Sequence, residues 1–211
     1  MRILPLIASL ALLTLGAAPL PVLPVGIWTN EEHAYFEDLR GAVAPPWTGL
    51  RMRTSAAGTR EWQPIDKFGA ALGAWRTTPV TGLSQTADGR WTIGGSEIRR
   101  AAAFTCWMSI KKFASKPDGS ADWTYAGKLA SFDQGGRVRS GGGTSGAPAA
   151  IFRLRNVIWP APSTNKPSLV LYVHRPDAPD HAVSYAWADP DAKLIGINLR
   201  WVQGSCSRDE G

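Results

Sequence analysis

Three Arg-x-Arg pairs are the residues in this sequence whose type and spacing best suit the binding of an anion. They are Arg51 with Arg53, Arg137 with Arg139, and Arg153 with Arg155. Residues two apart on a strand point to the same side, so each pair presents two guanidinium groups to one face. On neighbouring strands they would bind a sugar acid, a lipid headgroup or an anionic polymer through bidentate contacts. The alternative, favoured by strand alternation alone, is that the arginines face solvent and pair with acidic residues across strands.

A second motif concerns nucleophilic catalysis. The segment 143–148 reads Gly-Thr-Ser-Gly-Ala-Pro and resembles the surroundings of the nucleophile in chymotrypsin-like serine proteases. His33, Asp66 and Ser145 also follow that family's order of base, carboxylate and nucleophile, which must lie within hydrogen-bond reach of one another. The family's histidine stands in an Ala-Ala-His-Cys setting, whereas His33 follows Glu31 and Glu32 on an expected helix. We interpret the segment as a flexible turn and keep a Ser145 hydrolase as an alternative.

Histidine and aspartate also gather near the C-terminus. The residues are His174, Asp177, Asp180, His181, Asp189 and Asp191. Such side chains can hold calcium or zinc, but there is no Asp-x-Asp-x-Asp-Gly loop and no His-x-x-x-His pair. Asp-Ala-Pro-Asp and Asp-Pro-Asp are typical of β-turns. We predict no metal site and no cofactor.

The first residues predict export. Arg2 precedes the apolar run 3–15, and the small residues 16–18 follow, as in a signal peptide covering 1–18. The run is shorter than the roughly 20 residues that span a bilayer, although an uncleaved anchor is the alternative. We therefore expect a secreted or periplasmic chain, a single β domain over 19–211, with no transmembrane segment. The net charge of +6 comes from basic residues scattered among acids, which does not favour nucleic acid as a partner.

The rest of the chain predicts an all-β, mainly antiparallel fold, a single barrel or sandwich with one short N-terminal helix, and we favour the barrel. The helix is expected over 30–39, where Asn30 can cap and Gly41 can stop it. Short strands are expected at 47–53, 60–65, 91–93, 104–110, 123–132, 151–159, 168–174, 182–187 and 194–202. The glycine-rich stretch 135–146 is expected to be a long mobile loop with a brief extended middle.

The chain has two cysteines, Cys106 and Cys206. Two thiols in an oxidising compartment most often pair, and a bridge here would tie the C-terminus to the body of the sheet. The alternative is a catalytic thiol, which the absence of a histidine nearby in the sequence does not favour. We predict a structural disulfide.

A family resemblance supports the barrel. Gly26-Ile27-Trp28 is similar to the Gly-x-Trp opening strand of lipocalins and related calycin barrels. The resemblance implies that Trp28 closes one end of the barrel and packs on a basic residue of the last strand, for which Arg200 is the candidate. It also implies a bridge from the C-terminal Cys206 to a mid-barrel strand holding Cys106. The chain departs from the family in having no Thr-Asp-Tyr motif and too little sequence after Arg200 for the usual helix.

Together these features predict an exported, non-catalytic binding protein for a small apolar or anionic ligand. An apolar cavity would be lined by tryptophans, with Trp47, Trp75 and Trp107 as candidates chosen for their aromatic size. An anionic envelope ligand would instead meet the arginine face formed by Arg137, Arg139, Arg153 and Arg155. A structural envelope protein without enzymatic activity is a further alternative.

Overall fold

The computed structural model describes residues 22–210, and the predicted signal peptide lies outside them. Antiparallel strands dominate this part of the chain, and it contains one α-helix, α1 (Glu31–Leu39). The predicted all-β, antiparallel class with one short N-terminal helix is therefore confirmed. Within 22–210 no helix is both long and apolar enough to cross a bilayer.

The N-terminal half forms a six-stranded antiparallel sheet in the order β3-β2-β1-β6-β5-β4. Its strands are β1 (Gly26–Thr29), β2 (Gly49–Thr54), β3 (Arg60–Ile65), β4 (Leu83–Gln85), β5 (Trp91–Ile93) and β6 (Ser96–Ala101). Leu23, Trp28, Leu50, Met52 and Ile98 are buried together against it. We call it the first sheet.

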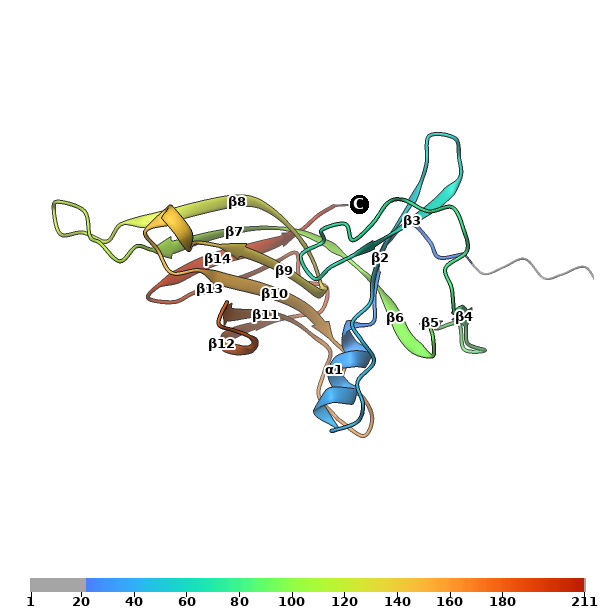
Figure 1. The fold of residues 1–211 in the computed structure, drawn as a ribbon. Helices are drawn as coiled ribbons and strands as arrows, with labels where there is room; N and C mark the ends of the chain where they lie inside the picture. The colour runs from blue at the N-terminus through green and yellow to red at the C-terminus, as the bar shows by residue number, and fades with distance from the viewer. Residues whose placement is uncertain (1–21, 211) are drawn as a thin grey trace, which may run out of the picture.

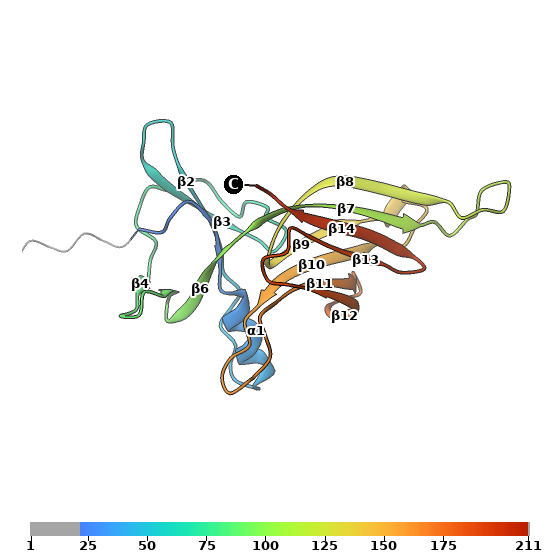
Figure 2. The ribbon, with the colours of Figure 1, turned by 180° about the vertical axis from the view of Figure 1, so that it is seen from behind.

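The C-terminal half consists of two four-stranded antiparallel sheets (Figures 1 and 2). The second sheet has the order β12 (Ala178–Ala188), β11 (Ser168–Arg175), β10 (Ala150–Val157) and β9 (Gln134–Ser140). The third has the order β13 (Leu194–Asn198), β14 (Val202–Arg208), β7 (Ala103–Lys111) and β8 (Trp123–Phe132). Their facing sides bury one apolar core, to which both sheets contribute. Of the two expected architectures, this two-layer arrangement is the sandwich, and its curved strands are compatible with a barrel-like fold.

Strand alternation decides which side chains enter this core. On β10, Phe152 and Leu154 point into it and are 1 % exposed. Arg153 and Arg155 therefore point to the opposite face of the second sheet, because side chains on a strand alternate. The first turn of α1 reaches that outer face, because Glu31 and Glu32 accept hydrogen bonds from Arg153 and Arg155. Figure 1 shows the helix beside the end of β10.

The helix starts where the sequence predicts, but Asn30 has a different role from the expected cap. Its side chain donates to Pro46 O at 2.9 Å and accepts from the Thr48 N–H at 2.7 Å. The first-turn N–H of Glu31 is instead bonded by the Thr29 hydroxyl at 3.3 Å. Asn30 thus fixes the loop before β2 against the helix start, and with it the position of α1.

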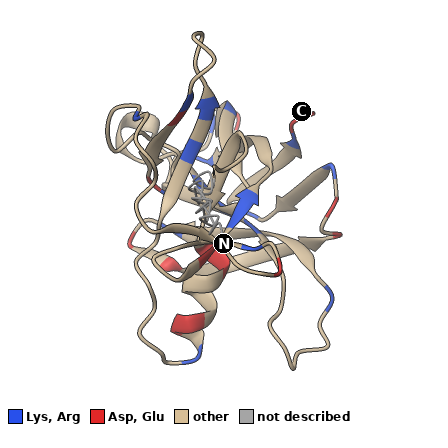
Figure 3. Ribbon diagram, turned by 90° about the vertical axis from the view of Figure 1, so that its right-hand side faces the viewer, with Lys and Arg blue, Asp and Glu red and all other residues tan. Residues whose placement is uncertain are grey.

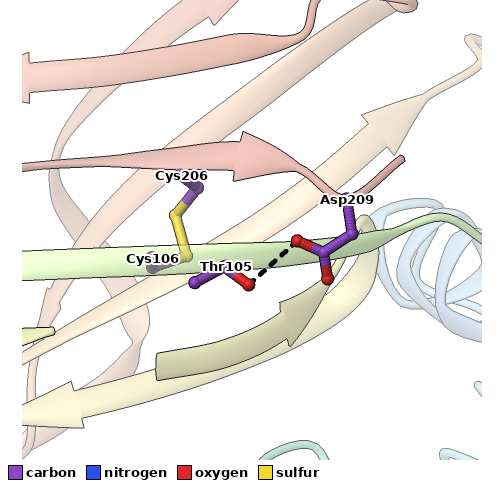
Figure 4. The surroundings of a disulfide bond; sticks show 4 residues. All are labelled: Thr105, Cys106, Cys206 and Asp209. Carbon is purple, nitrogen blue, oxygen red and sulfur yellow. Dashed lines mark hydrogen bonds between the residues drawn. A yellow bond between two sulfur atoms is a disulfide. The ribbon is translucent and has the colours of Figure 1, made fainter. Parts of the chain in front are cut away.

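The predicted disulfide joins Cys106 on β7 to Cys206 on β14, which lie directly opposite each other in register. Both are buried in the core between the second and third sheets. Figure 4 shows the bridge beside a hydrogen bond from the Thr105 hydroxyl to Asp209, 2.9 Å long. The C-terminal strand is therefore tied to the body of the third sheet, as expected.

The prediction for the glycine-rich stretch is wrong in its first half. Residues 134–140 form β9, which pairs with β10, and the short 3-10 turn η1 (Gly143–Ser145) follows. Gly135 has a φ of +84°, and a Cβ there would collide with the Glu31 carboxylate. This glycine is needed for the close approach of α1 to β9, a requirement that composition does not reveal.

The contact implied by the lipocalin resemblance is not the one that the structure shows for Trp28. Its cross-strand neighbour on β6 is Arg100, and its ring packs edge-on against Trp91, with 6.3 Å between centroids. Arg200 lies between β13 and β14, in a different sheet. Trp28 belongs to the core of the first sheet because β1 pairs with β2 and β6.

Candidate functional site

Helix α1 covers arginines that were expected to face solvent. Arg137 is 5 % exposed, Arg153 8 % and Arg155 1 %. The expectation of solvent exposure is therefore wrong for these three. The first turn of α1 lies against Arg153 and Arg155, and Lys67 and Asp180 lie against Arg137. Arg139, the fourth member of the predicted face, is exposed. Arg51 and Arg53 lie on β2 in the first sheet, so the three pairs do not form one surface.

The first turn of α1 brings two carboxylates to the covered arginines. Arg153 Nη2 donates to Glu31 Oε1, and Arg155 Nε donates to Glu32 Oε1 at 2.8 Å. Both glutamates are 3 % exposed. The Tyr35 ring lies 3.5 Å from the Arg155 guanidinium carbon, a cation–π contact that further fixes this arginine. Figure 3 marks the acidic positions of the helix in red and the Lys and Arg positions in blue.

The two buried carboxyls respond to their surroundings in opposite directions. Burial alone raises the pKa of Glu31, but the nearby Arg153 and Arg155 outweigh it and hold the pKa below its ordinary value. Burial raises the pKa of Glu32, and Arg155 only partly offsets it. The second carboxylate oxygen of Glu32 has no hydrogen-bond partner. Glu31 is thus the carboxylate that the fold holds charged.

A cavity of about 290 Å³ opens beside this pair, and we call it the α1 cavity. It is lined by Glu31, Ala34, Tyr35, Asp38, Ala44, Pro45, Trp47, Lys67, Arg137, Arg153 and Asp180. At its rim, Arg137 Nη2 donates to Asp180 at 2.9 Å, and the Asp180 side chain is 73 % exposed. The cavity therefore joins α1, the loop before β2, and strands β9, β10 and β12.

Three residues of the lining keep a buried N–H group without a partner. These groups are Nε of Arg137, Nε of Arg153 and Nε1 of Trp47. A buried donor without a partner costs free energy, so such groups in a native fold call for an explanation. Lys67 adds an ammonium group whose pKa is lowered by burial and by Arg137. The residues that line the cavity thus carry positive charge and buried donors that the protein itself leaves without an acceptor.

His174 lies on β11 close to these arginines. Burial and the charges of Arg153 and Arg137 lower its pKa to about 4, so the imidazole is neutral at pH 7. The positive charge of this region comes from the guanidinium groups and Lys67. Among residues 22–210 there is no group of three or more potential metal-ligating side chains.

Of the three candidate tryptophans, the structure brings only Trp47 to the α1 cavity with Arg137 and Arg153. The Trp75 ring lies under the guanidinium of Arg53, 3.8 Å from its carbon, next to the first sheet. Trp107 lies on β7 and stacks with Tyr125 of β8, with 6.1 Å between the ring centroids. The tryptophans therefore do not line one common apolar cavity.

The structure gives the three residues of the hypothetical triad separate partners. Ser145 Oγ accepts the N–H of Ala147 at 3.2 Å. His33 Nδ1 accepts the N–H of Glu97 at 2.8 Å. Asp66 accepts the N–H groups of the turn that follows it, at 2.9 and 2.8 Å. Each of these side chains is bonded to a backbone N–H group, and residues 22–210 contain no hydrogen bond between nucleophile and base of the kind that a triad requires.

Sequence reasoning missed the acidic half of the site. Glu31 and Glu32 were assigned only to the favourable N-terminus of a helix. The available signal was the adjacent acidic pair Glu31 and Glu32 at a helix start, together with a strand that carries two arginines of opposite charge. Lys67 and Asp180 had no such signal, because they reach the cavity from a loop and from the edge strand β12.

No family model matches the chain, and neither a curated protein nor a solved structure is significantly similar to it.

Proposed function

We propose that this protein is a non-catalytic binding protein for a small anionic ligand whose carboxylate enters the α1 cavity. The observation that carries the proposal is the set of buried N–H groups of Arg137, Arg153 and Trp47 that have no partner around this cavity. A ligand carboxylate would supply the missing acceptors. The signal peptide predicted from residues 1–18 would take the protein to the periplasm or the exterior, where it would meet such a ligand.

A carboxylate suits the site because the same guanidinium groups already bind carboxylates of the chain. Arg153 binds Glu31, and Arg137 binds Asp180. Glu31 is buried and remains with the helix, whereas Asp180 is largely exposed and free to move away. We infer that a ligand carboxylate replaces Asp180 on Arg137, with Trp47 and Lys67 as further donors. Guanidinium groups bind planar carboxylates with two parallel hydrogen bonds, which gives the exchange its specificity.

Titration calorimetry with D-galacturonate, and with inorganic phosphate as a second anion, tests this proposal. Arg137→Gln should weaken galacturonate binding at least about tenfold, the loss expected when a charge-assisted hydrogen bond is removed. Arg139→Gln is the matched control, since Arg139 lies two residues along the same strand and is exposed; it should change the affinity less than about twofold. Lys67→Gln, at a half-buried loop position, provides a second variant if Arg137→Gln fails to fold.

Two results would overturn the proposal. One is the absence of heat with either anion at millimolar concentration in the folded wild-type protein. The other is equal loss of binding in the Arg137 and Arg139 variants, because a general charge effect would then explain it.

The exchange model also predicts the effect of removing the competing carboxylate. Asp180→Asn should strengthen galacturonate binding by about threefold, because the largely exposed Asp180 carboxylate no longer competes for Arg137. The measurement is the dissociation constant at fixed ionic strength. Weaker binding in this variant would mean that Asp180 contacts the ligand directly.

A further inference from the structure

A run of aromatic rings leads away from the α1 cavity along the outer face of the second sheet. Tyr172 on β11 lies 6.3 Å from Tyr185 on β12, and Tyr185 lies 5.4 Å from Trp187, measured between ring centroids. Tyr185 and Trp187 are each 55 % exposed, although large aromatic side chains on a sheet are normally packed. We call these three residues the aromatic row.

The aromatic row is continuous with the cavity. In the strand register, Arg137 of β9 lies beside Arg153 of β10, Arg153 beside Tyr172, and Tyr172 beside Tyr185. The Arg153 guanidinium carbon is 5.7 Å from the centre of the Tyr172 ring. One face of one sheet therefore carries buried guanidinium groups at β9 and β10 and exposed rings at β12.

We propose that the aromatic row binds the successive sugar rings of an acidic oligosaccharide, one uronate of which places its carboxylate in the α1 cavity. This inference rests on the proposed function of that cavity. A sugar ring has an apolar C–H face that stacks on an aromatic ring, and hydroxyl groups at its edge that stay in water. A uronate adds the carboxylate that Arg137 and Arg153 are placed to bind. The arrangement fits an oligosaccharide whose uronate carboxylate lies in the cavity and whose further sugar rings stack on the aromatic row.

The charge distribution favours a sugar chain over a single-stranded nucleic acid. A nucleic acid needs cations along its backbone as well as rings for its bases. Strand β12 contains no lysine or arginine, and its Asp180 pairs with Arg137. No lysine or arginine accompanies the rings on β12, whereas Arg137, Arg153 and Lys67 line the cavity. This matches a ligand with a carboxylate at the cavity and an uncharged surface over the rings.

Chain-length dependence of binding tests the inference. Galacturonate, its α-1,4-linked trimer and the fully methyl-esterified trimer are titrated into the whole protein, with tryptophan fluorescence and calorimetry as readouts. The wild type should bind the trimer about tenfold more tightly than the monomer, through the added ring contacts. Esterification should abolish the binding. The double variant Tyr185→Ala, Trp187→Ala should bind trimer and monomer equally, with the affinity for the monomer unchanged.

The matched control is Tyr125→Ala, because Tyr125 is a 69 % exposed, stacked tyrosine on a strand of the third sheet. It should leave the ratio of trimer to monomer affinity unchanged. Monomer binding without any gain for the trimer, or a gain that survives in the double variant, would refute the aromatic row while leaving the cavity proposal intact. If the wild type did not bind the galacturonate monomer, the proposed function of the α1 cavity would be refuted. Tighter binding of a thymidine oligonucleotide than of the trimer would show that the row serves a nucleic acid.

Discussion

Replacing Glu31 by glutamine tests the buried ion pair that fastens α1 to the second sheet. The substitution keeps the shape of the side chain and removes its charge, so Arg153 loses its anionic partner in a buried setting. Breaking a buried pair from one side costs about 3–5 kcal/mol. We expect about 3 kcal/mol, the lower end, because the amide oxygen still accepts a hydrogen bond. That is a large part of the roughly 5–15 kcal/mol that stabilises an ordinary domain.

Glu32→Gln is the matched control, because Glu32 is equally buried and lies in the same helical turn. Any loss of favourable interaction with the helix dipole, about 0.5 kcal/mol, is then common to both variants. The fold raises the pKa of Glu32, because burial outweighs Arg155, so folding disfavours the charged form of Glu32 relative to the unfolded chain, opposite to Glu31. We expect Glu32→Gln to cost less than about 1 kcal/mol at pH 7.

The assay is urea unfolding followed by circular dichroism, repeated from pH 7 to pH 3. Because the folded-state pKa of Glu31 lies below its ordinary 4.5, its stabilisation is complete above pH 4.5 and is lost as the pH falls through the folded-state value. The gap in free energy of unfolding between wild type and Glu31→Gln should therefore shrink below pH 4.5. Equal costs for the two variants at pH 7, or a gap that stays constant with pH, would refute the assignment of Glu31 as the charged partner.

Three further predictions concern the disulfide, the contact between Gly135 and α1, and the alternative of a Ser145 hydrolase. Replacing Cys106 and Cys206 together by alanine should lower the free energy of unfolding by up to about 4–5 kcal/mol, since the bridge closes a loop spanning 100 residues; urea midpoints measure this, and an unchanged midpoint would contradict it. Gly135→Ala should cost about 2 kcal/mol more than Gly119→Ala, because both have a φ near +80° but only the first would collide with the helix carboxylate; equal thermal shifts would speak against that contact. A fluorophosphonate probe should not label the protein, and labelling that disappears in Ser145→Ala would instead establish a hydrolase.

The fold class was predictable because it depends on local patterns. Short runs with period-two alternation and frequent turn residues indicate antiparallel strands in any context. The helix was predictable from Asn30, the acidic first turn and Gly41. β9 was not, because Gly135 and Gly136 read as a loop. The lack of a side chain at Gly135 serves a contact with Glu31, about a hundred residues earlier in the chain, whereas Gly136 lies against Phe132.

The candidate site was predictable only in part. The sequence pointed to Arg137, Arg153 and Trp47, which do meet at one cavity. It predicted that the arginines are exposed to solvent, whereas they are buried. Periodicity indicates which residues share a face but not what covers that face. It could not connect Asp180 with Arg137, or Tyr172 with Tyr185, because those pairs depend on strand order and register.

By itself, the sequence determined the antiparallel class, most of the strands, the helix and the pairing of the two cysteines, since each follows from residue type, local spacing or the scarcity of alternatives. It did not reveal β9, and the single strand expected at 194–202 is wrong, because β13 ends at Asn198 and β14 begins at Val202. Tertiary structure decided that α1 lies over the outer face of the second sheet. That placement brings Glu31 and Glu32 to Arg153 and Arg155, whereas Arg137 pairs with Asp180 of β12. The α1 cavity lies beside these pairs, and its lining contains buried donors without a partner. The physical reason is that desolvation and charge pairing depend on distances between segments far apart in the chain, and no local pattern encodes those distances.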